Sequence, residues 1–146
     1  MRAKDYLLQI RKLDRLINNK LLEFDQWMSI ATSTTVSTEG ERVQSSGSKD
    51  KMGDAVARLV DVQVEINREI DRLVDLKRQV IRDIEQLPIA DEYDILHMIY
   101  VQGMTFQEAA DELNKSYRWT TALHGRALSH LQKILNEKEQ ENENHS

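Results

Sequence analysis

The sequence predicts an all-α protein, in which a long antiparallel helical hairpin, coiled-coil-like, is followed by a three-helix helix-turn-helix domain. Three observations lead to this prediction. Charged residues make up 31% of the 146 residues, whereas proline occurs once and glycine five times, a composition typical of long helices. Apolar residues recur at steps of three and four along two long segments, as they do on one helix face. A polar stretch separates the two segments, so the chain can fold back there.

Segment 2–31 is expected to be the first helix. Its apolar residues recur at steps of four and three: Tyr6, Ile10, Leu13, Ile17, Leu21, Phe24 and Met28. Acids are interspersed with bases on the opposite face, which favours burial against a partner helix over membrane-surface binding. Segment 32–53 is dominated by serine, threonine and glycine. It has too few apolar side chains to offset the entropy of ordering, so we expect a flexible loop.

Segment 54–86 is expected to be the second helix and to complete a hairpin over residues 1–86. Its apolar residues again recur at steps of three and four, and the polar Gln63 and Lys77 interrupt the seam. Further apolar residues widen the stripe beyond what one partner helix covers. We therefore expect a homo-oligomer that forms through the hairpin.

Segment 87–135 carries signals for three helices. Pro88 ends the preceding helix, and 89–102 shows the spacing of one helix face. Gly103 suits a left-handed helix end, and Thr105 with Glu108 forms a capping box that opens a helix over 106–113. Ser116 is an N-cap for a helix over 117–135. A short helix, a turn and a longer helix in this order predict a helix-turn-helix motif. The second helix of such a motif enters the DNA major groove. Segment 136–146 is expected to be a flexible acidic tail.

Charge is distributed unevenly over this domain. The chain has a net charge of −5, but 115–135 contains four bases and no acid, whereas 89–114 contains six acids and no base. Local basicity on one helix favours phosphate contact. The candidate DNA-binding residues are Lys115, Ser116, Tyr117, Arg118, Thr121, Ala122, Gly125 and Arg126. We expect Arg118 and Thr121 to contact bases and Lys115, Ser116 and Arg126 to contact phosphates, while the small residues allow close approach.

The sequence gives no reason to expect catalysis. It has no cysteine, and its four histidines have no carboxylate at a metal-ligand spacing. The acids Asp91, Glu92 and Asp94 are expected at the surface of a first helical turn, where they suit the helix dipole. We find no nucleophile elbow, Walker motif or dinucleotide fingerprint, and expect no enzyme, cofactor or metal. No apolar run is long enough for a signal peptide or a membrane span, so we expect a cytoplasmic protein.

Residues 89–135 resemble region 4 of bacterial sigma factors, the part that reads promoter DNA. The resemblance rests on the pattern Tyr-x-x-Gly-x-(Ser/Thr)-(Tyr/Phe)-x-Glu-(Ile/Ala)-Ala-x-x-Leu followed by Arg-Ala-Leu-x-x-Leu. The matching residues are Tyr100, Gly103, Thr105, Phe106, Glu108, Ala110, Leu113, Arg126, Ala127, Leu128 and Leu131. Thr120 departs from the family's usual valine, and Leu123 from its usual arginine.

The order of a coiled-coil region before a lone region-4-like domain resembles phage-encoded late-transcription regulators of the RinA/ArpU type. The resemblance implies a sequence-specific DNA-binding transcriptional regulator in a host bacterial cell. It would activate late or packaging genes by reading a promoter-proximal site with the helix 117–135, and its partners would be double-stranded DNA and host RNA polymerase. Two alternatives stay open, a phage small terminase-like initiator of DNA packaging and an RNA polymerase-binding interaction protein.

Overall fold

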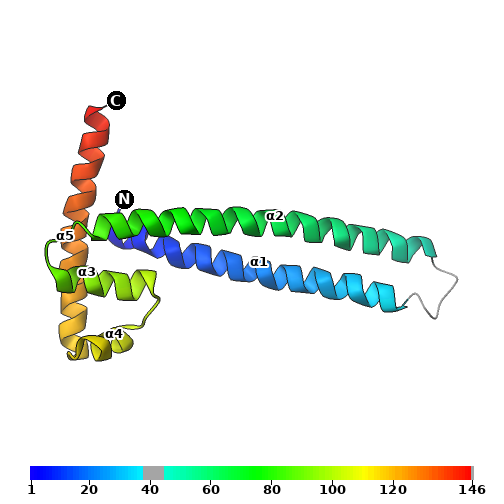
Figure 1. Ribbon diagram of the computed structural model, residues 1–146, viewed down its shortest axis with the longest axis horizontal. Coiled ribbons are helices and arrows are strands. Elements are labelled where there is room, and N and C mark those ends of the chain that lie inside the picture. The colour runs from blue at the N-terminus through cyan, green and yellow to red at the C-terminus, as the bar shows by residue number, and fades with distance from the viewer. Residues whose placement is uncertain (38–44, 146) are drawn as a thin grey trace. The chain divides into compact units, whose positions relative to one another are not determined.

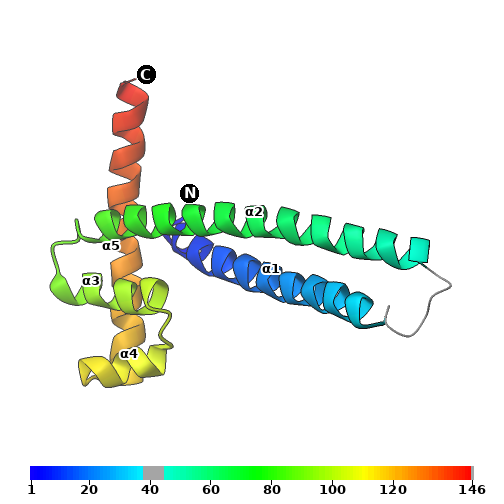
Figure 2. The ribbon, with the colours of Figure 1, turned by 45° about the vertical axis from the view of Figure 1, so that its right-hand side comes forward.

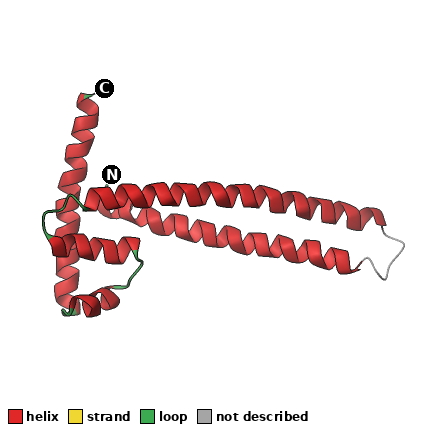
Figure 3. Cartoon of the chain, in the orientation of Figure 1, coloured by secondary structure: helices red, strands yellow, loops and turns green. Residues whose placement is uncertain are grey.

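The computed structural model describes residues 1–37 and 45–145. Its elements are α1 (Ala3–Ser37), α2 (Ser45–Ile84), α3 (Ala90–Leu96), η1 (His97–Val101), α4 (Phe106–Leu113) and α5 (Tyr117–Asn144) (Figure 1). The described residues contain no strand, and Figure 3 shows only helices joined by loops. The prediction of an all-α protein is confirmed. The chain divides into unit 1, which is Met1–Lys12 with Val74–Ser146, and unit 2, which is Leu13–Leu73.

In unit 2, α1 and α2 lie side by side and run in opposite directions (Figures 1 and 2). Ile17 of α1 and Val62 of α2 are among the buried side chains of this unit. The seam on α2 differs from the predicted one. Gln63 is exposed and its amide donates to Asn67 Oδ1 at 3.1 Å, whereas the adjacent Val62 is fully buried. Successive residues are about 100° apart around a helix, so Val62 and Gln63 face different directions. The apolar stripe on α2 is wide, and the packing of α1 buries the side that carries Val62.

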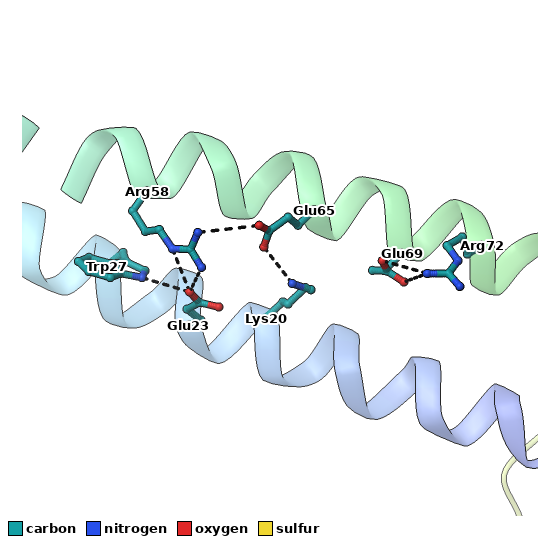
Figure 4. Close-up of polar contacts among 7 residues, drawn as sticks. All are labelled: Lys20, Glu23, Trp27, Arg58, Glu65, Glu69 and Arg72. Carbon is teal, nitrogen blue, oxygen red and sulfur yellow. Dashed lines mark hydrogen bonds and ion pairs between the residues drawn. The ribbon is translucent and has the colours of Figure 1, made fainter. Parts of the chain in front are cut away.

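Ion pairs connect the two helices of unit 2 (Figure 4). Lys20 Nζ of α1 donates to Glu65 Oε2 of α2 at 2.9 Å, and the Arg58 guanidinium of α2 donates to Glu23 Oε1 of α1 at 2.6 Å. The hydrogen bond from Arg58 lowers the pKa of Glu23, and that from Lys20 lowers the pKa of Glu65. The cation of one pair, Lys20, is on α1, whereas the cation of the other pair, Arg58, is on α2. A shift of one helix along the other would therefore bring like charges closer together.

The predicted loop 32–53 is too long at both of its ends. Helix α1 continues to Ser37 and α2 begins at Ser45, while residues 38–44 lie outside the described residues. Thr32 illustrates how a hydroxyl is accommodated in a helix, because its Oγ1 donates to the Met28 carbonyl at 2.8 Å, one turn back. Serine and threonine residues at both ends of the predicted loop therefore belong to the helices.

The core of unit 1 joins the start of α1, the end of α2 and the elements from α3 onward. Its fully buried apolar side chains include Leu7, Ile10, Val80, Ile84, Ile95, Leu96 and Leu131. A polar group is buried with them. Tyr6 Oη of α1 donates to Asp83 Oδ2 of α2 at 2.5 Å, and Lys138 Nζ of α5 donates to Asp83 Oδ1 at 2.9 Å. Asp83 thus accepts hydrogen bonds from two other helices.

The predicted flexible tail 136–146 is largely helical, because α5 continues to Asn144. This stretch contains no glycine or proline, and its glutamates, single glutamine and single lysine are good helix formers. Lys138 also anchors it through Asp83, which is 1% exposed. An acidic segment of this kind can therefore form an exposed helix when a contact with a neighbouring helix, here that of Lys138 with Asp83, holds one side of it in place.

Candidate nucleic-acid interface

The chain reverses before α4 at the glycine that the sequence singled out. The predicted helix 89–102 consists of α3 followed by η1, whose turn is wider because Gln102 N–H donates to the His97 carbonyl, five residues back, at 2.9 Å. Gly103 then has a φ of +78°, in the left-handed region that side chains with a Cβ rarely adopt. The prediction of a left-handed helix end at Gly103 is confirmed.

Both helices of the candidate site begin at the predicted caps. Thr105 Oγ1 accepts from Glu108 N–H at 3.1 Å, and Thr105 N–H donates to Glu108 Oε1 at 3.3 Å, which completes the capping box of α4. Asn114 ends α4 in the left-handed conformation with a φ of 55°. Ser116 Oγ accepts from Trp119 N–H at 3.0 Å and caps α5. These three devices fix the turn between the two helices.

Helix α5 packs one side against α3 and α4. Ala109 and Ala110 of α4 are fully buried, and their small side chains allow close helix approach. Thr120 of α5 is also fully buried, and its Oγ1 donates to the Ser116 carbonyl at 2.9 Å, so the hydroxyl is satisfied. The buried side of α5 consists of Thr120, Leu123, His124, Ala127 and Leu131. The opposite side of the helix is left for solvent or a ligand.

Most of the predicted site residues lie on that opposite side or in the turn before it. Lys115, Ser116, Tyr117, Arg118, Ala122, Gly125 and Arg126 are exposed, whereas Thr121 is half-buried. At 3.6 residues per turn, Arg118, Ala122, Gly125 and Arg126 fall within an arc of about 100°. The structure therefore brings two cations and two small residues together on one exposed helix face.

The other predicted site residues have local partners. The Tyr117 ring lies edge-on to the Phe106 ring with centroids 6.3 Å apart, and Lys115 Nζ lies 5.1 Å from the centroid of the Trp119 ring. Thr121 Oγ1 donates to the Arg118 carbonyl at 3.0 Å. The Thr121 hydroxyl proton is thus used within the helix, which makes this residue a weaker candidate for base contact than Arg118.

Sequence reasoning missed two residues of the same face. Ser129 and Lys133 are exposed and continue the arc beyond Gly125 by steps of four. The helical spacing that selected Arg118, Ala122 and Gly125 could have found them. Residues in the first turns of a recognition helix are the ones that reach bases, so a search for base contacts does not extend to Ser129 and Lys133.

His124 lies on the buried side of α5, and its Nε2 is 2.7 Å from Tyr100 Oη. Burial lowers the pKa of His124, and the positive charges of Lys4 and Arg11 lower it further. Burial also raises the pKa of the Tyr100 hydroxyl. The pair therefore favours a neutral imidazole and a protonated phenol, which suits a structural hydrogen bond. Among the described residues, no group of three or more potential ligands is placed to hold a metal ion.

Glu92 corrects the prediction that the acids of the first turn of α3 lie at the surface. It is 1% exposed, and its carboxylate contacts His130 Nδ1 of α5, with Oε2 at 3.0 Å. Glu92 precedes Ile95, Leu96 and Ile99 by three, four and seven positions, so it belongs to their buried helix face. That spacing was a usable signal, although nothing in the sequence pointed to His130 as its partner.

The fold and this site define an all-helical protein with an exposed basic face on α5. The chain belongs to the family described as a protein of unknown function (DUF1492), whose model matches residues 31–132. The matched range begins within α1 and extends to Gln132 in α5. No curated protein and no solved structure matches the chain. Among the described residues, no helix is both long enough and apolar enough to cross a membrane.

Proposed function

We propose that this protein is a sequence-specific DNA-binding transcriptional regulator. In this proposal α4, the turn at Asn114 and α5 act as a helix-turn-helix, and α5 enters the major groove. The observation that supports it is the exposed face of α5, where Arg118, Ala122, Gly125 and Arg126 lie opposite the buried side chains. No acid occurs between Tyr117 and Asn136, so DNA phosphates would meet no like charge on this face.

The candidate residues have two proposed roles, which are contact with base edges and contact with phosphates. Arg118 is in the first turn of α5, where side chains of a recognition helix reach base edges, and a guanidinium can bind guanine through two hydrogen bonds. Lys115, Ser116 and Arg126 flank it and would bind phosphates. The Ser116 hydroxyl oxygen accepts the capping hydrogen bond, which leaves its proton to donate.

The substitution Arg118→Ala tests the reading role. We expect it to weaken binding to the preferred site by about 1–3 kcal/mol, or roughly 5- to 150-fold in Kd, because one bidentate base contact is lost. The matched control is Arg68→Ala, which removes an exposed cation from α2. Selection from fragments of the source genome, followed by titration of the selected duplex, measures both variants. If the Arg118→Ala and Arg68→Ala variants bind the selected duplex with equal affinity, α5 is not the helix that recognises the DNA sequence.

Gly125 provides a second test, in which stability and binding change in opposite directions. A Cβ added at Gly125 meets nothing within 4 Å, so alanine fits the helix without strain. We expect Gly125→Ala to raise the free energy of unfolding by about 0.5–1 kcal/mol, because glycine loses more backbone entropy. The added methyl would nevertheless separate the α5 backbone from the groove wall and weaken DNA binding. Unchanged binding in the stabilised variant would contradict a close approach at Gly125.

We further propose that the regulated genes are late or packaging genes of a phage, with host RNA polymerase as a second partner. This proposal rests on the resemblance of 89–135 to sigma factor region 4. It also rests on the order of the chain, in which a coiled-coil-like region precedes the region-4-like domain. Enrichment of a promoter upstream of structural genes would support it. Enrichment within terminase genes would instead indicate a packaging initiator, and cross-linking to polymerase without DNA would indicate a protein-interaction module.

A homo-oligomer that forms through unit 2 is part of the proposal. Val56, Val60 and Val64 of α2 follow one another at steps of four and are 48%, 59% and 52% exposed. A second copy that covers this stripe would bury apolar surface and double the number of phosphate contacts. Sedimentation should show an oligomer that Val60→Lys dissociates. A wild-type monomer at micromolar concentration would contradict this part.

A further inference from the structure

Basic residues at the start of α1 lie beside the middle of α5. Arg2 and Lys4 line one open depression of about 440 Å³ together with Ser129 and Lys133. The rest of the lining is uncharged and consists of Ala3, Leu128 and Gln132. Arg2, Lys4 and Lys133 are all exposed, and all belong to unit 1. Three cations from opposite ends of the sequence thus share one concave surface that no acid lines.

The Gln132 side chain holds the start of α1 in this place. Its Oε1 accepts from Ala3 N–H at 2.7 Å, and its Nε2 donates to the Met1 carbonyl at 3.1 Å. The first N–H groups of a helix have no partner within the helix, so the amide satisfies one of them from the neighbouring helix. Arg2 and Lys4 lie on either side of Ala3, which is 3% exposed. Their backbone positions are therefore fixed relative to α5, while their charged ends stay in solvent.

This surface continues the exposed face of α5. Ser129 and Lys133 belong to the same helical arc as Arg118, Ala122 and Gly125. At 1.5 Å of rise per residue, Arg118 and Arg126 are about 12 Å apart along α5, close to the width of the B-DNA major groove, also about 12 Å. Lys133 follows about 10 Å further along the helix. A helix that places its first turns in the groove therefore carries Lys133 towards the phosphate backbone at the groove's edge.

We propose that Arg2, Lys4 and Lys133 bind the DNA phosphate backbone next to the major groove that α5 enters. The inference rests on the proposed function, because it needs α5 on DNA. The three side chains contact backbone and no base edge, so they add affinity without sequence preference. Base reading and backbone anchoring are thereby divided between the first turns of α5 and the surface that α5 shares with the start of α1.

Salt dependence separates these two roles. Each phosphate contact contributes about 0.9 to the slope of the logarithm of affinity against the logarithm of salt concentration. In the full chain, we expect Arg2→Ala, Lys4→Ala and Lys133→Ala combined to lower that slope by about 2 to 3 for each copy of the chain that binds the duplex. The combined variant should bind the preferred duplex and a mixed-sequence duplex more weakly by the same factor. Arg118→Ala should weaken only the preferred duplex and leave the slope nearly unchanged.

The charge-matched control combines Lys51→Ala, Arg68→Ala and Arg78→Ala, which remove three exposed cations from α2. We expect this variant to keep most of the wild-type slope, and circular dichroism should show full helix content for both triple variants. A slope equal to that of the control, with binding still sensitive to Arg118→Ala, would overturn the backbone contact and leave the proposed function standing. Wild-type protein that binds neither duplex would overturn both.

Discussion

The substitution Tyr6→Phe tests the buried polar group that joins α1, α2 and α5. Tyr6 is 7% exposed, and its hydroxyl donates to Asp83, which is 1% exposed and whose other oxygen accepts from Lys138. Burial raises the pKa of the Tyr6 hydroxyl, and the hydrogen bond to Asp83 raises it further, so the phenol remains a donor throughout the accessible pH range. Phenylalanine keeps the buried ring and removes only this donor.

The expected cost follows from the charge on the acceptor. A hydrogen bond to a charged group contributes about 1.5–3 kcal/mol to stability, more than one between neutral groups. Asp83 keeps Lys138, whose side chain is 42% exposed and is therefore screened by water. That remaining contact cannot replace a buried donor. We therefore expect Tyr6→Phe to lower the free energy of unfolding by about 2 kcal/mol.

Urea unfolding followed by fluorescence measures this change within unit 1. Trp119 belongs to unit 1 and Trp27 to unit 2, so a Trp27→Phe background makes Trp119 the reporter. The control is Tyr117→Phe, because Tyr117 is 53% exposed and its hydroxyl has no hydrogen bond within the described residues. We expect the control to stay within about 0.5 kcal/mol of the background protein. Equal effects of Tyr6→Phe and Tyr117→Phe would refute the reasoning.

Three further predictions concern the candidate site. Thr105→Ala removes the capping box of α4 and should lower the free energy of unfolding by about 1 kcal/mol in urea; no loss would show that the cap contributes nothing. Gly103→Ala meets no atom within 4 Å, so its cost of about 1–2 kcal/mol comes from the φ of +78° alone, and a crystal structure with an unchanged turn should accompany that cost. His124 has a lowered pKa, so the unfolded state binds its proton first. Its contribution is present above the usual value of 6.5 and is lost as the pH falls from there through the folded pKa. The difference in unfolding free energy between wild type and His124→Gln should therefore shrink between about pH 8 and about pH 5, and a constant difference would contradict it.

The helix boundaries around the candidate site were predictable because their signals are local. A capping box connects residues three positions apart, and a left-handed helix end is marked by one glycine. Thr105, Glu108, Ser116 and Gly103 accordingly do in the structure what the sequence predicted. The ends of the long helices were less predictable. Serine, threonine and asparagine occur both in loops and in exposed helices. Composition alone therefore predicted a loop at 32–53 and a tail at 136–146 that include residues belonging to helices.

By itself, the sequence determined that the chain is helical and which side of α5 is basic, because both follow from spacing within a few turns. Only the tertiary structure decided which side of each wide stripe is buried and which distant residues meet. Val62 packs where Gln63 was expected, and Glu92 is buried against His130. Ala3 meets Gln132 across 129 positions, so Arg2 and Lys133 line the same depression. Such pairings depend on how helices pack in three dimensions, and no local periodicity encodes them.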